Sequence, residues 1–234
     1  MTSLQFKTVT VADVTSDIAR VRLAPMSPPF TFLPGQYIQI WCPDTDEWLS
    51  CSIVNIPSDS GEVELVLRHN SDTDSVNAFL KTAEQSGNFT VKGPLGHCVL
   101  PESNDSPLVF VAGGTGIAPF LSLLLSKPTA QKIHLFWGAR RVIDFYCLAA
   151  LEAFCDYLPF QYTLVLSESD TTWTGSTGLV HEKVAETFPT FKNEIVFASG
   201  PYPMVEKLWN ICHEHGLQPN QFLSDMMPKP STSL

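Results

Sequence analysis

The stretch Leu-Val-Phe-Val-Ala-Gly-Gly-Thr-Gly-Ile-Ala-Pro, residues 108–119, decides how this sequence folds. Its first five residues, Leu108 to Ala112, are apolar and rich in β-branched and aromatic side chains, which is typical of a strand buried on both faces of a parallel sheet. Three glycines within residues 113–116 permit a sharp turn and the close approach of a ligand to the backbone. Pro119 suits the first turn of a following helix. A strand, a glycine turn and a helix N-terminus together predict a site for phosphate.

The glycine turn alone does not identify a ligand. Gly113-Gly114-Thr115-Gly116 differs from the Gly-x-Gly-x-x-Gly dinucleotide fingerprint and lacks the Lys-Ser/Thr of a P-loop. A tight strand-to-helix turn without a ligand therefore stays open at this point. A second strand-then-glycine turn, Ser199-Gly200-Pro201, follows the apolar run 195–199. Because ligands of open parallel sheets bind beyond the carboxyl ends of the strands, we expect the two turns to face one crevice.

Composition limits the classes of function. The chain has 234 residues, of which 44% are hydrophobic and 16% charged, which indicates a globular protein. A net charge of −10 argues against nucleic acid and anionic membranes as partners. The six cysteines show neither Cys-x-x-Cys nor iron–sulfur spacing, so we expect no metal site and mostly buried thiols. The N-terminus has no signal-peptide pattern and no apolar run reaches membrane length, which predicts a cytoplasmic location.

The rhythm of the sequence changes near residue 101 and predicts two domains, a β domain followed by an α/β domain. Residues 1–101 read as a small antiparallel barrel, residues 102–107 as a linker, residues 108–225 as a doubly wound parallel-sheet domain, and residues 226–234 as a mobile tail. Strands are expected at 9–14, 18–23, 36–41, 52–56, 63–68, 89–91, 98–100, 108–112, 133–137, 162–166 and 195–199. Helices are expected at 75–82, from 119, at 144–154 and at 202–215.

A series of motifs occurs in a fixed order along the chain. They are Leu33-Pro34-Gly35-Gln36-Tyr37, Gly93-Pro94-Leu95-Gly96, the stretch 113–119, Phe136-Trp137-Gly138-Ala139-Arg140, Trp173-Thr174-Gly175-Ser176-Thr177-Gly178, Ser199-Gly200-Pro201 with Met204, and Phe222-Leu223-Ser224-Asp225. This ordered set resembles the ferredoxin–NADP⁺ reductase superfamily, and within it the stand-alone NAD(P)H:flavin reductases. The resemblance implies a six-stranded flavin-binding barrel followed by a nucleotide-binding domain. It also implies FAD or FMN as the flavin and NADH or NADPH as the nucleotide.

The resemblance also implies roles for single residues. Ser52 is the expected partner of flavin N5, and Ser199 would line the nicotinamide site where the family usually has cysteine; these two are the catalytic candidates. Either serine has an ordinary structural alternative. The cofactor-binding candidates are Tyr37, Cys51, Ser52, Ile53, Arg68, Asn77, Gly113, Gly114, Thr115, Gly116, Pro119, Arg140, Gly200, Pro201 and Asp225.

The sequence departs from the family pattern at the flavin motif Arg-x-Tyr/Phe-Ser, where it has Leu49-Ser50-Cys51-Ser52. In the family, the arginine meets a flavin phosphate and the aromatic ring packs on the flavin. Loss of a charge-assisted phosphate contact costs about 1.5–3 kcal/mol, which is roughly a tenfold to hundredfold loss of affinity. We expect Trp48 or Tyr37 to replace the ring and Arg68 to replace the charge.

The sequence predicts an oxidoreductase that transfers hydride from NADH or NADPH to a flavin and passes electrons to an acceptor. The acceptor would be free flavin or a separate electron carrier. Two alternatives stay open: a flavin-binding electron-transfer subunit of a larger redox complex, and a non-catalytic relative with a degraded flavin site. The acidic segment Ser167-Glu168-Ser169-Asp170 favours NADH, because the 2′-phosphate of NADPH needs a positive charge nearby, whereas Arg140 and Arg141 favour NADPH.

Overall fold

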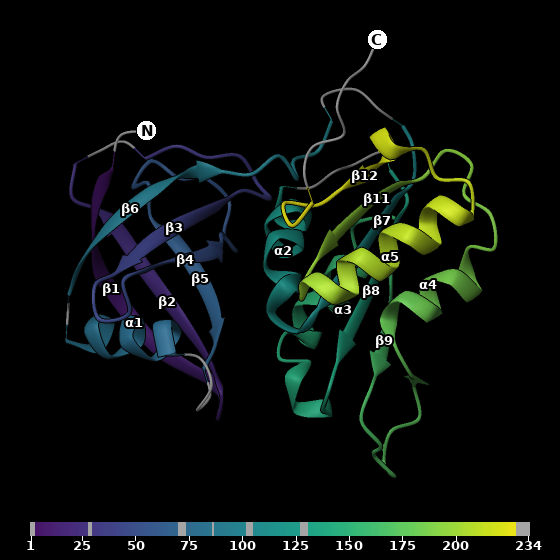
Figure 1. Cartoon of the computed structure of the whole chain (residues 1–234), viewed down its shortest axis with the longest axis horizontal. Coiled ribbons are helices and arrows are strands. Elements are labelled where there is room, and N and C mark those ends of the chain that lie inside the picture. The colour runs from purple at the N-terminus through teal and green to yellow at the C-terminus, as the bar shows by residue number, and fades with distance from the viewer. Residues whose placement is uncertain are drawn as a thin grey trace. The chain divides into compact units, whose positions relative to one another are not determined.

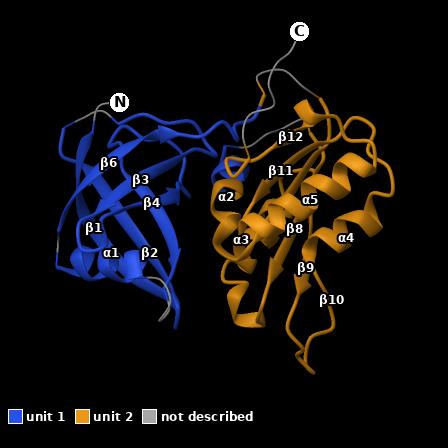
Figure 2. Ribbon diagram, viewed as in Figure 1, with its two compact units in different colours: residues 1–100, 121–126 blue, residues 101–120, 127–234 orange. Residues whose placement is uncertain are grey.

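The computed structural model describes residues 3–27, 30–69, 74–85, 87–101, 105–126 and 131–227. The chain divides into two units (Figure 2), one of residues 1–100 and 121–126 and the other of residues 101–120 and 127–234. Unit 1 is built on an antiparallel sheet and unit 2 on a parallel sheet flanked by helices (Figure 1), which confirms the predicted fold class. The linker residues 102–104 and the tail residues 228–234 lie outside the described residues.

Unit 1 is a six-stranded antiparallel barrel with one helix. Its elements are β1 (Leu4–Thr15), β2 (Ile18–Pro25), β3 (Tyr37–Cys42), β4 (Glu47–Ser52), β5 (Val63–Arg68), α1 (Asp74–Glu84) and β6 (Asn88–Leu95). The strands pair in the order β4-β3-β6-β1-β2-β5. The two outer strands approach each other through an antiparallel bridge between Ile53 and Leu65, beside which the Val54 N–H donates to the Glu64 carbonyl at 2.8 Å.

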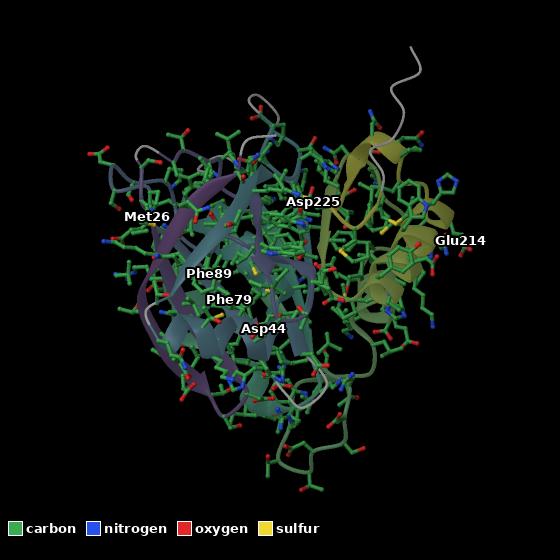
Figure 3. All side chains as sticks on the ribbon, turned by 60° about the vertical axis from the view of Figure 1, so that its left-hand side comes forward. Met26, Asp44, Phe79, Phe89, Glu214 and Asp225 are labelled. Carbon is green, nitrogen blue, oxygen red and sulfur yellow. The ribbon has the colours of Figure 1, made fainter. Side chains whose placement is uncertain are left out.

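Side chains that alternate between the two faces of each strand fill the interior of the barrel. Ile38, Ile40 and Cys42 of β3 point into the core, because every second residue of a strand faces the same side. Helix α1 adds its own apolar side chains to this core, and Phe79 of α1 packs against Phe89 of β6 with ring centroids 4.8 Å apart (Figure 3). The barrel interior is therefore closed by side chains, and ligands of unit 1 must bind on its outer surface.

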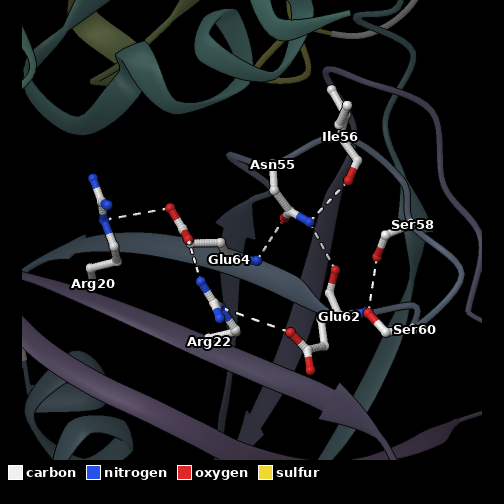
Figure 4. Close-up of polar contacts among 8 residues, drawn as sticks. All are labelled: Arg20, Arg22, Asn55, Ile56, Ser58, Ser60, Glu62 and Glu64. Carbon is white, nitrogen blue, oxygen red and sulfur yellow. Dashed lines mark hydrogen bonds and ion pairs between the residues drawn. The ribbon is translucent and has the colours of Figure 1, made fainter. Parts of the chain in front are cut away.

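Asn55 directs the chain from β4 into β5 (Figure 4). Its Nδ2 donates to the carbonyls of Ile56 at 3.0 Å and Glu62 at 2.9 Å, while its Oδ1 accepts from the Glu64 N–H at 2.7 Å. The Asn55 amide thus forms hydrogen bonds with backbone groups that would pair with another strand if β4 continued. On the outer surface, Arg22 of β2 pairs with Glu62 and Glu64 at 3.7–3.9 Å, which adds little stability because the arginine is exposed.

Two predicted strands of unit 1 are wrong. The strand expected at 52–56 is β4, which ends at Ser52, because Asn55 diverts the backbone hydrogen bonds that a continuing strand would use. The strand expected at 98–100 does not form. There the Cys98 carbonyl packs against Gly35, at the position that a Cβ on residue 35 would occupy. The segment is therefore held by the turn before β3 rather than by a sheet edge.

Unit 2 is a six-stranded parallel sheet with helices on both faces. Its strands are β7 (Leu108–Gly113), β8 (Ile133–Ala139), β9 (Phe160–Leu166), β10 (Ser176–Thr177), β11 (Ile195–Ser199) and β12 (Phe222–Leu223), in the order β10-β9-β8-β7-β11-β12. Its helical elements are η1 (Gly114–Ile117), the first three residues of α2 (Ala118–Leu125), whose residues 121–125 count with unit 1, and η2 (Val142–Asp144), α3 (Leu148–Cys155), α4 (Val180–Thr187), α5 (Tyr202–Glu214) and η3 (Pro219–Gln221). The strand order reverses between β7 and β11, which is the ligand-binding switch point of such sheets.

Strand β7 is buried on both faces, as its sequence predicts. Val109 and Val111 pack in one core cluster with residues of α4 and α5. On the other face the Phe110 ring stacks on Phe120 of α2 at 4.8 Å and meets Phe197 of β11 edge-on at 5.4 Å. Helices therefore cover both sides of the sheet, and the doubly wound arrangement is confirmed.

Two helices of unit 2 differ from expectation. The helix predicted to begin at 144 begins at Leu148, because the Asp144 carboxylate turns back to accept from the Arg141 N–H and guanidinium, each at 3.1 Å. Helix α4 was not predicted. Its start is fixed by the Glu182 carboxylate, which accepts from the Leu179 N–H at 3.2 Å.

The remaining expectations concern cysteines and membranes. All six cysteines are free, and five of them are buried, which confirms the prediction of mostly buried thiols; Cys155 is exposed. Among the helices within the described ranges, none combines the length and apolarity needed to cross a membrane.

His134 of β8 is held as a neutral ring. Gln161 Nε2 donates to its Nδ1 at 3.1 Å, its Nε2 lies 2.9 Å from Thr163 Oγ1, and its ring stacks on Phe136 at 4.0 Å. Burial lowers the pKa of His134 to about 4 from the ordinary value of 6.5. Burial of the ring in the folded chain therefore favours His134 without its second proton.

We predict that unit 2 loses stability as the pH falls from about 6.5 to about 4. In this window the unfolded chain binds a proton at His134 that the folded chain does not bind, so protonation favours unfolding. The variant His134→Gln replaces the imidazole with an amide that can form hydrogen bonds but does not titrate in this range, so it should show a shallower loss. Urea unfolding at pH 7.5, 5.5 and 4.5 measures this, and equal pH slopes for the two proteins would contradict it.

Candidate functional site

The turns after β7 and β11 lie against each other, backbone to backbone. A Cβ on Gly200 would stand 2.9 Å from the Gly113 nitrogen, and a Cβ on Gly116 would stand 2.6 Å from the Ser199 carbonyl carbon. Only glycine permits this approach. The structure thus brings together the two glycine turns that the sequence singled out, at the point where the strand order reverses.

The three glycines of the first turn have different roles. At Gly113 a Cβ would meet Met204 Sδ at 2.8 Å and Pro201 Cδ at 2.9 Å, so this glycine, like Gly116, serves packing. Gly114 has φ +56°, and nothing lies within 4 Å of the position that its Cβ would take. The sequence attributed ligand access to all three glycines, whereas only Gly114 leaves open space for a ligand beside the backbone.

A buried tryptophan fixes the open glycine. Trp137, with 0% of its surface exposed, donates from Nε1 to the Gly114 carbonyl at 2.8 Å. Phe145 and Tyr146 meet its ring edge-on at 5.0 and 5.5 Å. Phe145 in turn stacks on Trp173 at 5.4 Å. Sequence reasoning singled out Trp137 only as part of a family motif, because no local pattern reveals a hydrogen bond to a loop 23 residues away.

The other nucleotide candidates also follow strands of this sheet, except Pro119, which is buried in α2. Arg140 is exposed directly after β8, and its carbonyl accepts from the Glu168 N–H at 3.2 Å, so the loops after β8 and β9 run side by side. Pro201 is exposed at the start of α5, and Asp225 is half-buried in the turn after β12. All three therefore lie at the carboxyl edge, with the glycine turns.

Exposed apolar side chains gather at the same edge. Among the described residues of unit 2, the exposed large apolar side chains that follow carboxyl strand ends are Val142, Ile143, Leu179, Tyr202 and Met226. A rim of this composition can cover the apolar faces of an aromatic ring, while the backbone of the glycine turn offers N–H donors. The edge thus combines the two kinds of contact that a nucleotide requires.

In unit 1, Tyr37 and Ser52 are cross-strand partners on β3 and β4, and both are half-buried. The structure brings these two candidates together on the outer face of the barrel, because their neighbours Ile38 and Cys51 point inward. Cys51 is 4% exposed and Ile53 is 0% exposed. Any contact that Cys51 or Ile53 makes with a cofactor would therefore come from the backbone rather than from the side chain.

Two further flavin candidates lie apart from Ser52. The Arg68 guanidinium forms an ion pair with the Asp17 carboxylate at 2.6 Å, so its charge already has a partner inside the barrel wall. Asn77 lies in the first turns of α1, whose Ser75 carbonyl accepts from Cys42 Sγ at 3.6 Å. Asn77 thus lies toward the Cys42 end of the β3–β4 pair, roughly 16 Å along the strands from Ser52.

Between these ends the outer face carries a row of side chains that we call the outer row: Tyr37, Gln39, Trp41, Trp48, Ser50, Ser52 and Lys92. The rings of Trp41 and Trp48 lie 5.3 Å apart, and Lys92 Nζ lies 3.6 Å from the centre of the Trp48 ring. The sequence considered Trp48 but missed Lys92. The alternation of inward and outward side chains in β6 could have identified Lys92, because Val91 is buried and the next residue faces outward.

Comparisons with known proteins decide the family. The family described as "Oxidoreductase FAD-binding domain" matches residues 4–100, and that described as "Oxidoreductase NAD-binding domain" matches residues 110–209. The chain belongs to the ferredoxin–NADP⁺ reductase superfamily. The two domain matches support FAD and NADH or NADPH as the cofactors of this superfamily member, as the resemblance implied.

Curated relatives of this superfamily member are longer than it is. The CDP-6-deoxy-L-threo-D-glycero-4-hexulose-3-dehydrase reductase of Yersinia pseudotuberculosis is 34% identical over 216 residues, which cover 91% of this chain and 65% of that protein. The reductase component of propane 2-monooxygenase from Rhodococcus jostii is 30% identical over 231 residues, which cover 94% and 62%. The chain therefore spans less than two thirds of the length of these relatives.

Solved structures share the fold of this superfamily member. The cytochrome P450 reductase of Amycolatopsis superposes with a TM-score of 0.85 at 24% identity, over 98% of this chain and 71% of that chain. The cytochrome b5 reductase domain of Ulva prolifera nitrate reductase gives 0.78 at 19% identity, over 93% and 94%. At these identities the likeness concerns the fold alone.

The residues present fit the two cofactors unequally. In unit 2 the open side of Gly114 is a cradle that a Cβ would fill, beside backbone donors that suit a phosphate. In unit 1 the Ser52 hydroxyl and the Tyr37 ring suit the edge and face of a flavin ring, whereas Leu49 and Cys51 offer neither charge nor ring. The positive charge of the outer row is Lys92.

We predict that alanine destabilises the protein to different degrees at two glycines of the same turn. Gly116→Ala forces a Cβ into the Ser199 backbone and should cost about 3 kcal/mol of stability or more. Gly114→Ala meets open space and should cost only about 1 kcal/mol, for its left-handed backbone. Thermal unfolding of both variants measures the difference, and equal losses would overturn the assigned roles.

Proposed function

We propose that this chain is an NAD(P)H-dependent reductase that passes a hydride from the nicotinamide nucleotide to a flavin, and electrons from there to an acceptor. The observation that carries the proposal is the open glycine turn at the strand-order reversal, joined in one chain to an FAD-binding barrel. The bound cofactors supply the hydride chemistry. The protein contributes binding, orientation and exclusion of water.

In this proposal, backbone groups and side chains of both units have separate roles. The backbone at Gly114 and Thr115 binds the pyrophosphate of the nucleotide, and Ser199 lines the nicotinamide position. The Ser52 hydroxyl forms a hydrogen bond to the flavin ring edge, with the Tyr37 ring beside it. Ser52 and Ser199 are therefore the groups closest to the reacting atoms, and neither needs to act as an acid or base.

Lys92 takes the part of the arginine that the flavin motif lacks. It lies in a cross-strand line with Gln39 and Ser50, next to the position of Leu49, and on the same outer face as Ser52. An ammonium group there attracts a flavin phosphate, and the face of the Trp48 ring, whose centre lies 3.6 Å from Lys92 Nζ, holds the ammonium in place. The sequence expected Arg68 in this role, and its ion pair with Asp17 makes Lys92 the better choice.

NADH is the preferred nucleotide in this proposal. The Glu168 backbone adjoins that of Arg140 at the carboxyl edge, where the ribose of a bound dinucleotide lies in such sheets. A carboxylate repels a 2′-phosphate and accepts a hydrogen bond from a 2′-hydroxyl. Asp170 is used within its own loop, because it accepts from the Thr172 N–H at 2.8 Å and hydroxyl at 2.6 Å. Glu168 is therefore the residue that selects NADH.

The acceptor is proposed from the relatives' names. The Yersinia relative is named a dehydrase reductase and the Rhodococcus relative a reductase component, so both serve a second protein. A separate electron-carrier protein or acceptor is our first choice for this chain, and free flavin is the second, as in stand-alone flavin reductases. The six free cysteines support a cytoplasmic location.

The proposed function is tested by NADH oxidation, followed at 340 nm with and without added FAD or FMN. We expect oxidation that saturates with added flavin and is faster with NADH than with NADPH. A protein that is yellow when purified and needs no added flavin would indicate a tightly bound flavin and a partner acceptor. No oxidation with either nucleotide and either flavin would overturn the proposal and leave a non-catalytic relative.

The flavin contact is tested by Lys92→Gln. This variant should weaken FAD binding about tenfold, since a charge-assisted hydrogen bond contributes about 1.5–3 kcal/mol, and should leave riboflavin binding unchanged. Quenching of flavin fluorescence measures both affinities. The matched control is Lys132→Gln, which removes the same charge from an exposed site on unit 2. An equal loss for riboflavin, or no loss for FAD, would refute the role of Lys92.

A further inference from the structure

The peptide between Gly114 and Thr115 has its direction set from inside the protein. The Gly114 carbonyl accepts the Trp137 Nε1–H at 2.8 Å, and the Trp137 ring is fully buried. This carbonyl therefore points into unit 2. The peptide is trans, and in a trans peptide the carbonyl and the following N–H point in opposite directions. The Thr115 N–H consequently points away from Trp137.

The outward side of this peptide is the open side of the turn. Gly114 has no atom within 4 Å of its Cβ position, whereas Gly113 and Gly116 are tightly packed. The open space lies at Gly114, on the peptide whose N–H belongs to Thr115. Gly114 begins the 3₁₀ helix η1 with φ +56°, a backbone conformation with little preference of its own, and the Trp137 indole adds a buried side-chain hydrogen bond to this first peptide of the helix.

We propose that Trp137 is a positioning residue of the nucleotide site: its indole N–H holds the Gly114–Thr115 peptide so that the Thr115 N–H donates to a pyrophosphate oxygen of the dinucleotide. Without this anchor the peptide can rotate and present its carbonyl, which repels an anion. The proposal rests on the proposed function in one respect, namely that a nicotinamide dinucleotide is the ligand.

The surroundings of Trp137 make it a rigid anchor. Phe145 and Tyr146 fix its ring edge-on, and Phe145 is itself stacked on Trp173. Trp173 donates from Nε1 to the Ser176 carbonyl at 2.9 Å. Within the part of the chain that the structure describes, this group of rings holds two indole-to-carbonyl hydrogen bonds, of which that of Trp137 reaches the glycine turn.

The experiment compares Trp137→Phe with Trp173→Phe in the full chain. Each variant loses one indole donor and keeps an aromatic ring, so each leaves one loop carbonyl without its partner. The probe is ADP-ribose, which carries the pyrophosphate but no nicotinamide, with calorimetry as the measurement. We expect Trp137→Phe to raise the dissociation constant about tenfold and Trp173→Phe to change it less than about threefold.

The kinetic signature separates positioning from general damage. Trp137→Phe should raise the KM for NADH about as much as the dissociation constant of ADP-ribose, with kcat nearly unchanged, because pyrophosphate binding is equal in ground and transition states. Equal effects of the two variants on ADP-ribose, or a loss confined to kcat, would overturn the proposal.

A measurement on the unaltered protein covers the case in which Trp137→Phe does not fold. In NMR spectra, ADP-ribose should shift the Thr115 amide downfield by more than other amides of the turn, while adenosine, which lacks the phosphates, should leave it in place. An unmoved Thr115 amide in the presence of bound ADP-ribose would refute the proposal. The ADP-ribose calorimetry and the NMR experiment need no flavin, so they can fail while NADH oxidation succeeds, and the reverse.

Discussion

The backbone contact between the turns after β7 and β11 is the constraint on which unit 2 depends. Parallel strands β7 and β11 are neighbours whose connections leave in opposite directions, so their carboxyl ends must share a small space. Gly116 and Gly200 remove the side chains that would keep the turns apart. Their contact places Ser199 beside the first turn and leaves only Gly114 open. One packing requirement thereby brings the open Gly114 backbone and Ser199 to the same edge of the sheet, where we propose that the phosphates and the nicotinamide bind.

In unit 1 the direction of side chains decides what the altered flavin motif can do. Leu49 and Cys51 extend the core, because the strand alternates and their neighbours Trp48, Ser50 and Ser52 face outward. Leu49 and Cys51, which depart from the family pattern, are therefore well accommodated as core residues. Binding groups lost at those positions have to be supplied from other strands of the same face. Lys92 on β6 and Tyr37 on β3 lie on that face and are the replacements that we propose, which a linear motif cannot reveal.

The sequence predicted those features that depend on local pattern, and missed those that depend on distant partners. The apolar run 108–112 indicated a strand buried on both faces, and the structure has it in β7. The end of β4 at Ser52 depends on the Asn55 amide, and the start of α3 depends on the Asp144 carboxylate. Both are polar side chains that take over backbone hydrogen bonds, and residue types alone do not show which partner they find.

The same reasoning explains why the glycine motif was weak as a signal although its site is well defined. Backbone N–H groups bind phosphate, so the sequence needs only residues that leave the backbone accessible, and many tight turns use the same residues. What distinguishes a binding turn is that its peptides are held in one orientation. Trp137 reaches the turn from β8 and holds the Gly114 carbonyl, while the glycines on either side hold its position. The information that specifies the site is therefore divided between a permissive loop and a buried ring on the neighbouring strand.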